Sequence, residues 1–148
     1  MPEDSRLHIG QLLVQLTREL QQELFARLVD AGLEDARIAH THVTAYIRAE
    51  GSRLTELAAM ARMTLPAMSE TVNDLERLGV VERRPDPTDG RAKLIVLTER
   101  GWEVLSIARA IIRDLEADYA ARVGAREFEA AARTLDRLLH SLGEMPPR

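Results

Sequence analysis

The sequence predicts a mainly α-helical protein with one small β-hairpin, that is, an α+β fold. Two observations support this prediction. Apolar residues recur every three or four positions over most of the chain, whereas residues 80–97 combine β-branched residues with a cluster of turn formers. The 148 residues match the length of one domain, so we expect residues 1–148 to form a single domain. The net charge of −4 excludes a polybasic nucleic-acid coat, and the absence of cysteine excludes a disulfide scaffold, a cysteine nucleophile and a thiolate zinc site.

Long amphipathic helices are predicted at both ends of the chain. The first occupies residues 5–32 and ends near Gly32. After Thr98, which is a good N-cap, the apolar pattern continues through residues 101–143 and is interrupted at Gly124, which indicates two further helices. A small domain cannot cover such wide apolar stripes, and monomers rarely leave them exposed. We therefore expect both segments to form the interface of a homodimer.

The middle of the chain, residues 35–100, predicts three shorter helices. A helical pattern around Tyr46 stops at Gly51, and a two-turn helix follows over residues 54–61. The third helix runs to about Leu78 and is closed by Gly79; its start is indicated by Thr64 as the N-cap and by Pro66 in its first turn.

Two short strands are predicted next, residues 80–84 and 91–97, around a turn at Asp89-Gly90. Helix, turn, helix and hairpin is the order of a winged helix-turn-helix, in which the second helix enters the major groove of DNA and the hairpin, or wing, reaches a neighbouring groove. The same elements also occur in α+β cores that bind no nucleic acid.

The helix that begins at Thr64 has two contrasting faces. Its apolar face is predicted to contain Leu65, Met68, Val72 and Leu75, with Leu78 at the margin. Its opposite face carries Pro66, Glu70, Asn73 and Arg77. Asn can pair bidentately with adenine, Arg with guanine or phosphate, and Glu can accept from the amino group of cytosine. Any solvated helix face can have this composition, so the face alone does not decide the function.

The predicted wing concentrates positive charge. Arg91 follows the Asp89-Gly90 turn, where it can enter a narrow minor groove, and Asp89 can pair with Arg91 to aim it. Residues 83–93 include four basic side chains, Arg83, Arg84, Arg91 and Lys93, and two acidic ones, although the whole chain is acidic. This segregation favours DNA binding over a simple structural hairpin.

Four motifs together resemble the MarR family of bacterial transcriptional regulators: LTELA at residues 54–58, LERLGVVER at 75–83, DPTDGR at 86–91 and LTERG at 97–101. The resemblance covers the whole chain. It implies a homodimer whose two winged helices meet successive major grooves of a pseudo-palindromic operator, with Arg91 as the wing arginine and Asp89 orienting it. It also implies a small aromatic or anionic effector bound between the dimer helices and the winged helix.

The chain departs from the family pattern in one respect: the helix that reads DNA is acidic. Many members carry a basic residue in the helix that reads DNA, whereas this chain has Glu70, and residues 65–79 contain three acids and one arginine. This composition suggests reliance on the wing, on the helix N-terminus and on flanking arginines. The candidate DNA-binding residues are Arg53, Arg62, Thr64, Pro66, Ser69, Glu70, Asn73, Arg77, Arg84, Asp89, Arg91 and Lys93. The candidate ligand-binding residues are Leu16, His42, Tyr46, Trp102 and Arg109.

Other functions are weighed against this one. The sequence predicts a DNA-binding repressor relieved by a ligand; the alternative is a winged-helix protein-interaction module that has lost operator binding. A metabolite-modifying enzyme is a third hypothesis, but no catalytic motif frames Ser69, His42 or Asp74. His40 and His42 lie two residues apart, a spacing that directs them to different sides of a helix, so no metal or other cofactor is expected. No apolar run approaches the roughly 18 residues of a membrane span, and no signal peptide is recognised, so we expect a cytoplasmic protein without membrane contact.

Overall fold

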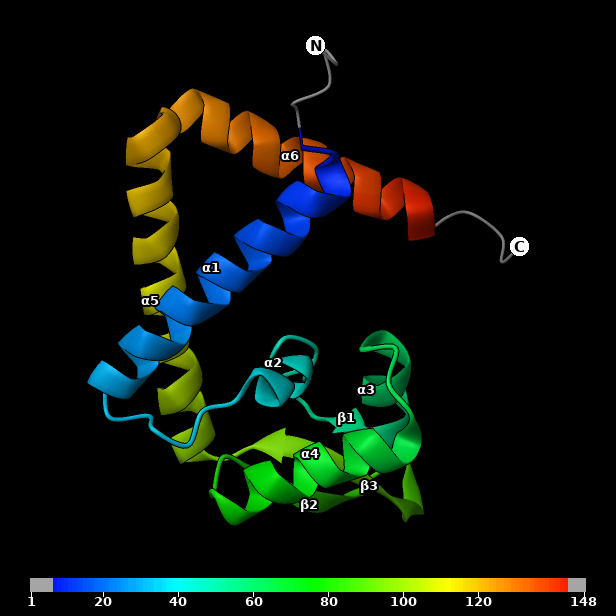
Figure 1. The fold of residues 1–148 in the computed structure, drawn as a ribbon. Helices are drawn as coiled ribbons and strands as arrows, with labels where there is room; N and C mark the ends of the chain where they lie inside the picture. Colours follow the sequence, from blue (N-terminus) through cyan, green and yellow to red (C-terminus); the bar gives the residue numbers. More distant parts are fainter. Residues whose placement is uncertain (1–6, 144–148) are drawn as a thin grey trace. The chain divides into compact units, whose positions relative to one another are not determined.

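The computed structural model describes residues 7–143, which fall into two compact units divided between Ile111 and Ile112. The first unit contains, in chain order, α1 (Ile9–Asp30), α2 (Ile38–Thr44), β1 (Ser52–Arg53), α3 (Leu54–Met60), α4 (Leu65–Arg77), β2 (Val81–Asp86), β3 (Asp89–Leu97) and the start of α5 (Glu99–Val123) (Figure 1). The second unit contains the rest of α5 and α6 (Ala125–Gly143). The predicted class, mainly helical with a small sheet that forms a winged helix-turn-helix, is confirmed. The organisation as one domain with two dimerisation segments stays a prediction.

The sheet has three antiparallel strands in the order β1-β3-β2. Val81 pairs with Leu97 and Arg83 with Ile95 in the hairpin. The third strand, β1, was not predicted, because two residues are too few to show an alternating pattern. Ser52 of this strand pairs with Ile95, on the other side of β3 from β2.

The hairpin turn lies two residues earlier than predicted. It consists of Pro87-Thr88, and Asp89 and Gly90 already belong to β3. The reason is the side chain of Asp86, whose Oδ1 accepts hydrogen bonds from the backbone N–H of Thr88 at 2.8 Å and from its hydroxyl at 2.7 Å. Such a local carboxylate cap competes successfully with the Asp-Gly pair as the place where the chain reverses.

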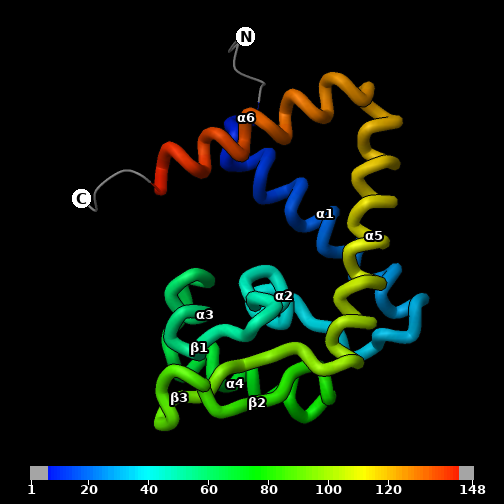
Figure 2. Tube along the Cα trace, turned by 180° about the vertical axis from the view of Figure 1, so that it is seen from behind, coloured from blue at the N-terminus to red at the C-terminus, as the bar shows by residue number. Residues whose placement is uncertain are grey.

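The core of the first unit lies where α4 packs against α2, α3 and the sheet, as Figure 2 shows from behind. Met68, Val72 and Leu75 are buried on α4, as predicted. Leu65, the first residue of the helix, was also predicted to be buried but is 46% exposed. Thr71, which was not predicted to be buried, lies in the core. The Thr71 hydroxyl donates to the carbonyl oxygen of Ala67 at 3.1 Å, so its burial leaves no unpaired polar group.

The second helix is shorter than predicted. It ends at Thr44, and the backbone N–H groups of Tyr46 and Ile47 both bond to the carbonyl oxygen of Val43, which forms a tight turn instead of another helical turn. At Gly51 the backbone has φ +103°, and a Cβ there would lie 2.7 Å from Cγ1 of Val96. Only glycine allows the chain to enter β1 at this point.

The first helix, predicted from residue 5, begins at Ile9; residues 5 and 6 lie outside the described residues. The strands predicted at 80–84 and 91–97 are Val81–Asp86 and Asp89–Leu97. The predicted helix boundaries at Gly79, Gly124 and Thr98 are confirmed. Gly79 has φ +71° after α4, and Gly124 has φ +101° between α5 and α6. The hydroxyl of Thr98 accepts a hydrogen bond from the backbone N–H of Gly101 at 3.0 Å and thus caps α5. Among residues 7–143, the structure contains no helix with the length and apolarity that a membrane span needs.

Candidate nucleic-acid interface

The candidate interface begins at the turn between α3 and α4. Arg62 is exposed there and adopts φ +53°, the left-handed conformation that reverses the chain after α3. The hydroxyl of Thr64 accepts a hydrogen bond from the backbone N–H of Ala67 at 3.3 Å, and Pro66 lies in the first turn, where its missing N–H costs nothing. The predicted cap of α4 is confirmed, and it leaves the N-terminus of the helix open to solvent.

Replacing Thr64 by alanine is expected to lower the free energy of unfolding by about 1 kcal/mol, because the N–H of Ala67 loses its acceptor. Urea denaturation followed by circular dichroism measures the change. Thr64→Ser, which retains the hydroxyl, is the control and should stay close to the wild type. Equal losses in both variants would show that the hydroxyl does not act as the cap.

The face of α4 that was predicted to read DNA is exposed. Pro66, Glu70, Asn73 and Arg77 are all exposed, and Ser69 is half-buried beside them. Among the described residues, Glu70 makes no hydrogen bond or ion pair, so its carboxylate is available to a partner. The structure therefore brings the predicted polar stripe together on one surface.

Two of the three acids on α4 are neutralised by cations or donors. Asp74 accepts a hydrogen bond from Nε2 of His40 at 2.7 Å and forms an ion pair with Arg77. Glu76 forms an ion pair with Arg83 of β2. The sequence count of three acids therefore overstates the negative field that DNA would meet, since Glu70 alone among them is unpaired in the described part of the chain.

Arg83 connects the hairpin to α4. Its Nη2 donates a hydrogen bond to Oδ1 of Asn73 at 2.7 Å, while Nη1 pairs with Glu76. Arg83 was predicted only to add positive charge to the wing. The structure shows that its guanidinium is used inside the protein, to hold two side chains of the neighbouring helix.

His40 lies under α4 and is 7% exposed. Its Nδ1 accepts the backbone N–H of Arg37 at 3.2 Å, so the ring proton is on Nε2, which donates to Asp74. Burial, with a smaller contribution from the charge of Arg37, lowers the pKa of His40, which keeps the imidazole neutral at neutral pH. His40 thus links α2 to α4 by a hydrogen bond. Within residues 7–143, no three histidine or carboxylate side chains are grouped as metal ligands would be.

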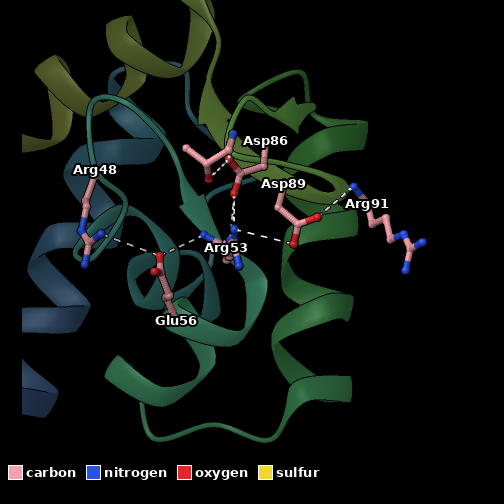
Figure 3. A network of polar contacts seen from close by, with 7 residues as sticks. Arg48, Arg53, Glu56, Asp86, Asp89 and Arg91 are labelled. Carbon is pink, nitrogen blue, oxygen red and sulfur yellow. Dashed lines mark hydrogen bonds and ion pairs between the residues drawn. The ribbon is translucent and has the colours of Figure 1, made fainter.

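The wing is fixed next to its turn by a buried carboxylate (Figure 3). Asp86 is 5% exposed, and its Oδ2 accepts two hydrogen bonds from Arg53, from Nε at 2.8 Å and from Nη2 at 2.6 Å. The hydroxyl and the backbone N–H of Thr88, together with Arg53, lower the pKa of Asp86 to about 2. Asp86 in turn raises the pKa of Arg53. Arg53, predicted as a phosphate contact, is therefore also the anchor of the wing.

Asp89 contacts Arg91 differently from the predicted ion pair. Its Oδ1 accepts the backbone N–H of Arg91 at 3.1 Å, and its Oδ2 lies 4.0 Å from Nη2 of Arg53. Asp89 thus fixes the backbone at Arg91 and leaves the guanidinium alone. Figure 3 shows the Arg91 side chain pointing away from the network, and no hydrogen bond or ion pair joins its guanidinium to any residue between 7 and 143.

Two further basic residues of the wing are exposed. Arg84 pairs with Glu82 on its own strand, and Lys93 lies opposite Pro85 on β3. Both side chains are accessible to phosphates, as predicted.

A cavity of about 150 Å³ lies inside the first unit, behind α4. Its walls include Phe25 and Leu28 of α1, His40 of α2, Leu75 of α4, and Arg100 and Val104 at the start of α5. None of the five residues predicted to bind a ligand lines this cavity: Leu16, Tyr46, Trp102 and Arg109 are exposed and His42 is half-buried elsewhere. A ligand site formed by these five residues stays a prediction, separate from this cavity. Leu16 lies nine residues before Phe25, roughly 13 Å along the helix, and the inner face of α5 carries Val104, Leu105 and Ala108 instead of Trp102.

The geometry of this unit can be compared with known proteins. Residues 40–92, which include α3, α4 and most of the hairpin, match the model of the MarR family. The HTH-type transcriptional regulator YdcH of Bacillus subtilis (strain 168) is 29% identical over 138 residues, which are 92% of this chain and 88% of the relative. Over these residues the chain resembles the MarR family, and over most of its length it resembles an HTH-type transcriptional regulator.

Solved structures are similar to this chain at the level of the fold. The MepR–DNA complex of S. aureus superimposes with a TM-score of 0.74 at 22% identity and covers 92% of this chain and 99% of the other. Wild-type apo MarR from E. coli superimposes with a TM-score of 0.74 at 24% identity and covers 91% and 99%. The winged helix-turn-helix is therefore the arrangement that this chain shares with these solved structures.

The contacts of several residues that shape the site were not predicted. His40, Arg83 and Asp86 each act through a partner that is distant in sequence, except for the contact of Asp86 with Thr88. The Asp-Pro-Thr order at residues 86–88 is a local signal for a capped turn and was sufficient to place the reversal there. No local pattern indicates that Arg83 reaches Asn73.

Proposed function

We propose that this chain is a MarR-family regulator that binds double-stranded DNA as a homodimer, at a pseudo-palindromic operator, and represses transcription by occupying the promoter. In this proposal α4 enters the major groove and the wing places Arg91 in the adjacent minor groove. The observation that carries the proposal is the exposed guanidinium of Arg91 on a hairpin whose turn end is fixed by Asp86 and Arg53. Within the described residues this guanidinium makes no hydrogen bond or ion pair, and the backbone that carries it is held by Asp89.

The charges around α4 support the proposal. Phosphates favour helix N-termini, and the open N-terminus of α4 is flanked by Arg62 and Thr64. The pairing of Asp74 and Glu76 reduces the repulsion that the sequence suggested. Lys93 supplies a further cationic group on an exposed position, whereas Arg77 and Arg84 are exposed but paired with Asp74 and Glu82. We assign the protein no catalytic activity, and its place is in the cytoplasm, where it meets the chromosome.

The apolar faces of α1 and α6 support a homodimer. On α1, Ile9, Val14 and Leu16 are about 60% exposed, and α6 buries no residue at all in the single chain. A second copy that covers both faces would remove this apolar surface from water. Among the similar proteins, MepR of S. aureus has been solved as a DNA complex.

Fluorescence anisotropy with the intergenic DNA upstream of the chain's own gene tests the proposal. We expect saturable binding that exceeds binding to a random duplex of equal length. The affinity should fall steeply between about 50 and 200 mM salt, because phosphate contacts release counterions. Equal affinity for both duplexes would contradict the proposal and favour the alternative, a protein-interaction module without an operator.

We further propose that a small aromatic or anionic effector binds in the cavity behind α4 and relieves repression. A cavity of this size has room for one aromatic ring. Arg37 and Arg100 provide donors at its wall, beside the apolar side chains of Phe25 and Leu28. An effector that prefers the DNA-free spacing of the two winged helices would shift the population away from the operator.

A melting-temperature screen with phenols and small carboxylates measures this expectation. A compound that binds only the folded protein must raise Tm as its concentration rises. The same compound should weaken operator binding, and Leu28→Trp, which fills the cavity, should abolish both effects. A compound that stabilises the wild type and the filled variant equally binds elsewhere.

A further inference from the structure

We infer that Arg83 determines the base specificity of α4 by fixing Asn73 as a hydrogen-bond donor, so that Asn73 reads guanine or thymine and not adenine. The inference rests on the proposed insertion of α4 into the major groove. It goes beyond that function, because it assigns a base preference to one side chain and a positioning role to another. It also reverses the adenine preference that the sequence suggested for Asn73.

The chemistry of the contact between Arg83 and Asn73 identifies which amide atom of Asn73 faces the guanidinium. Nη2 of Arg83 lies 2.7 Å from Oδ1 of Asn73. A guanidinium has five N–H donors and no acceptor, so the amide atom that faces it must be the oxygen. Nη1 of the same group is held by Glu76, one turn further along α4. Side chains of α4 therefore bind both Nη1 and Nη2 of the Arg83 guanidinium.

The backbone also fixes Arg83. It pairs with the buried Ile95 in the hairpin, and its side chain is only 27% exposed. Arg84, the next residue, is 64% exposed and pairs with Glu82 on its own strand. The two neighbouring arginines thus differ in role: Arg83 is committed to α4, whereas Arg84 leaves α4 untouched.

The consequence follows from the hydrogen-bond pattern of the bases. Bidentate recognition of adenine needs Oδ1 of asparagine for the N6 amino group and Nδ2 for N7. In this structure Oδ1 already accepts from Arg83, and the cation beside it repels a further amino donor. The exposed Nδ2 group still donates. In the major groove it meets the acceptors N7 and O6 of guanine, O4 of thymine and N7 of adenine. Adenine N7 lies beside the N6 amino group, which the cation of Arg83 repels, so the positive charge favours guanine and thymine.

Binding to a panel of operator duplexes tests the inference, with each position of one half-site changed in turn to all four base pairs. Asn73→Ala should lose discrimination at one position and so identify the base that Asn73 reads. There, the wild type should prefer guanine or thymine over adenine by about tenfold, the value of one good contact. Arg83→Met, which keeps the length of the side chain without its charge, should move the preference towards adenine at this position alone. Arg84→Met is the matched control and should leave the preference unchanged.

The outcomes separate this inference from the proposed function. A wild type that prefers adenine at the Asn73 position, an Asn73→Ala variant that discriminates like the wild type everywhere, or an Arg83→Met variant with unaltered preference would overturn the inference while operator binding stands. A wild type without sequence selectivity would overturn the proposed function itself. The contact is also visible without DNA: the side-chain amide resonances of Asn73 should shift in Arg83→Met and remain in place in Arg84→Met. Absence of that shift would overturn the inference independently of any operator.

Discussion

Replacing Arg91 by alanine is expected to weaken operator binding by about 10- to 100-fold, without a change in the free energy of unfolding. The expected loss is that of a guanidinium inserted in a narrow minor groove. The stability should not change, because the side chain is exposed and its guanidinium has no partner among residues 7–143. The backbone N–H of Arg91, which bonds to Asp89, remains in the variant.

Anisotropy titration measures the affinity, urea denaturation the stability, and a sizing column the dimer. Arg113→Ala removes the same charge from an exposed position on α5 and is the control for net charge. It should bind operator DNA within about twofold of the wild type. Arg91→Lys should have an intermediate affinity, because it keeps the charge and loses the planar fork. If Arg91→Ala binds as tightly as the wild type, the wing does not contact the groove through this residue.

The elements of the fold were predictable because their signals are local. The N-caps at Thr64 and Thr98 and the glycines at 79 and 124 mark helix ends within one or two residues of their observed positions. Where the prediction failed, tertiary contacts had decided the outcome. The two residues of β1 form a strand only because β3 pairs with them. Leu65 is exposed at the first residue of α4, and a helical wheel cannot show where the neighbouring elements stop covering the helix.

The exposed residues of the candidate site could be predicted from the sequence, whereas the hydrogen bonds and ion pairs between them could not. Its exposed stripe on α4 follows from helical spacing alone, and Arg91 follows from its place after the turn. The charges were misjudged, because their partners lie far away along the chain: His40 is 34 residues from Asp74, and Arg53 is 33 residues from Asp86. A count of charges in a window of sequence treats these groups as free. Their pairing converts an acidic helix into one with a single unpaired carboxylate among its described residues, Glu70.

The wing should depend most on Asp86, the residue that the sequence offered only as part of a turn. Asp86→Asn removes the charge that holds both Nε and Nη2 of Arg53 and weakens the bonds that close the turn at Thr88. We expect Tm to fall by about 5 °C, since charge-assisted bonds to a buried carboxylate are lost. Operator affinity should fall by about tenfold, because Arg91 is then presented by a looser hairpin. Glu82→Gln, which removes an exposed carboxylate from the same strand, is the matched control and should change neither quantity appreciably.

The pH dependence distinguishes loss of this charge from a general disturbance of the hairpin. The pKa of Asp86 is about 2 in the folded protein and near 3.8 in an unperturbed chain, so the unfolded state binds more protons between these values. The stabilisation by Asp86 is therefore fully present above about pH 4 and is lost as the pH falls towards 2. Urea denaturation at pH 7, 5 and 3 should show a constant difference between the wild type and Asp86→Asn at the two higher pH values and a smaller one at pH 3. A difference of the same size at all three would mean that the asparagine damages the turn by its shape, and that the carboxylate charge does not anchor the wing.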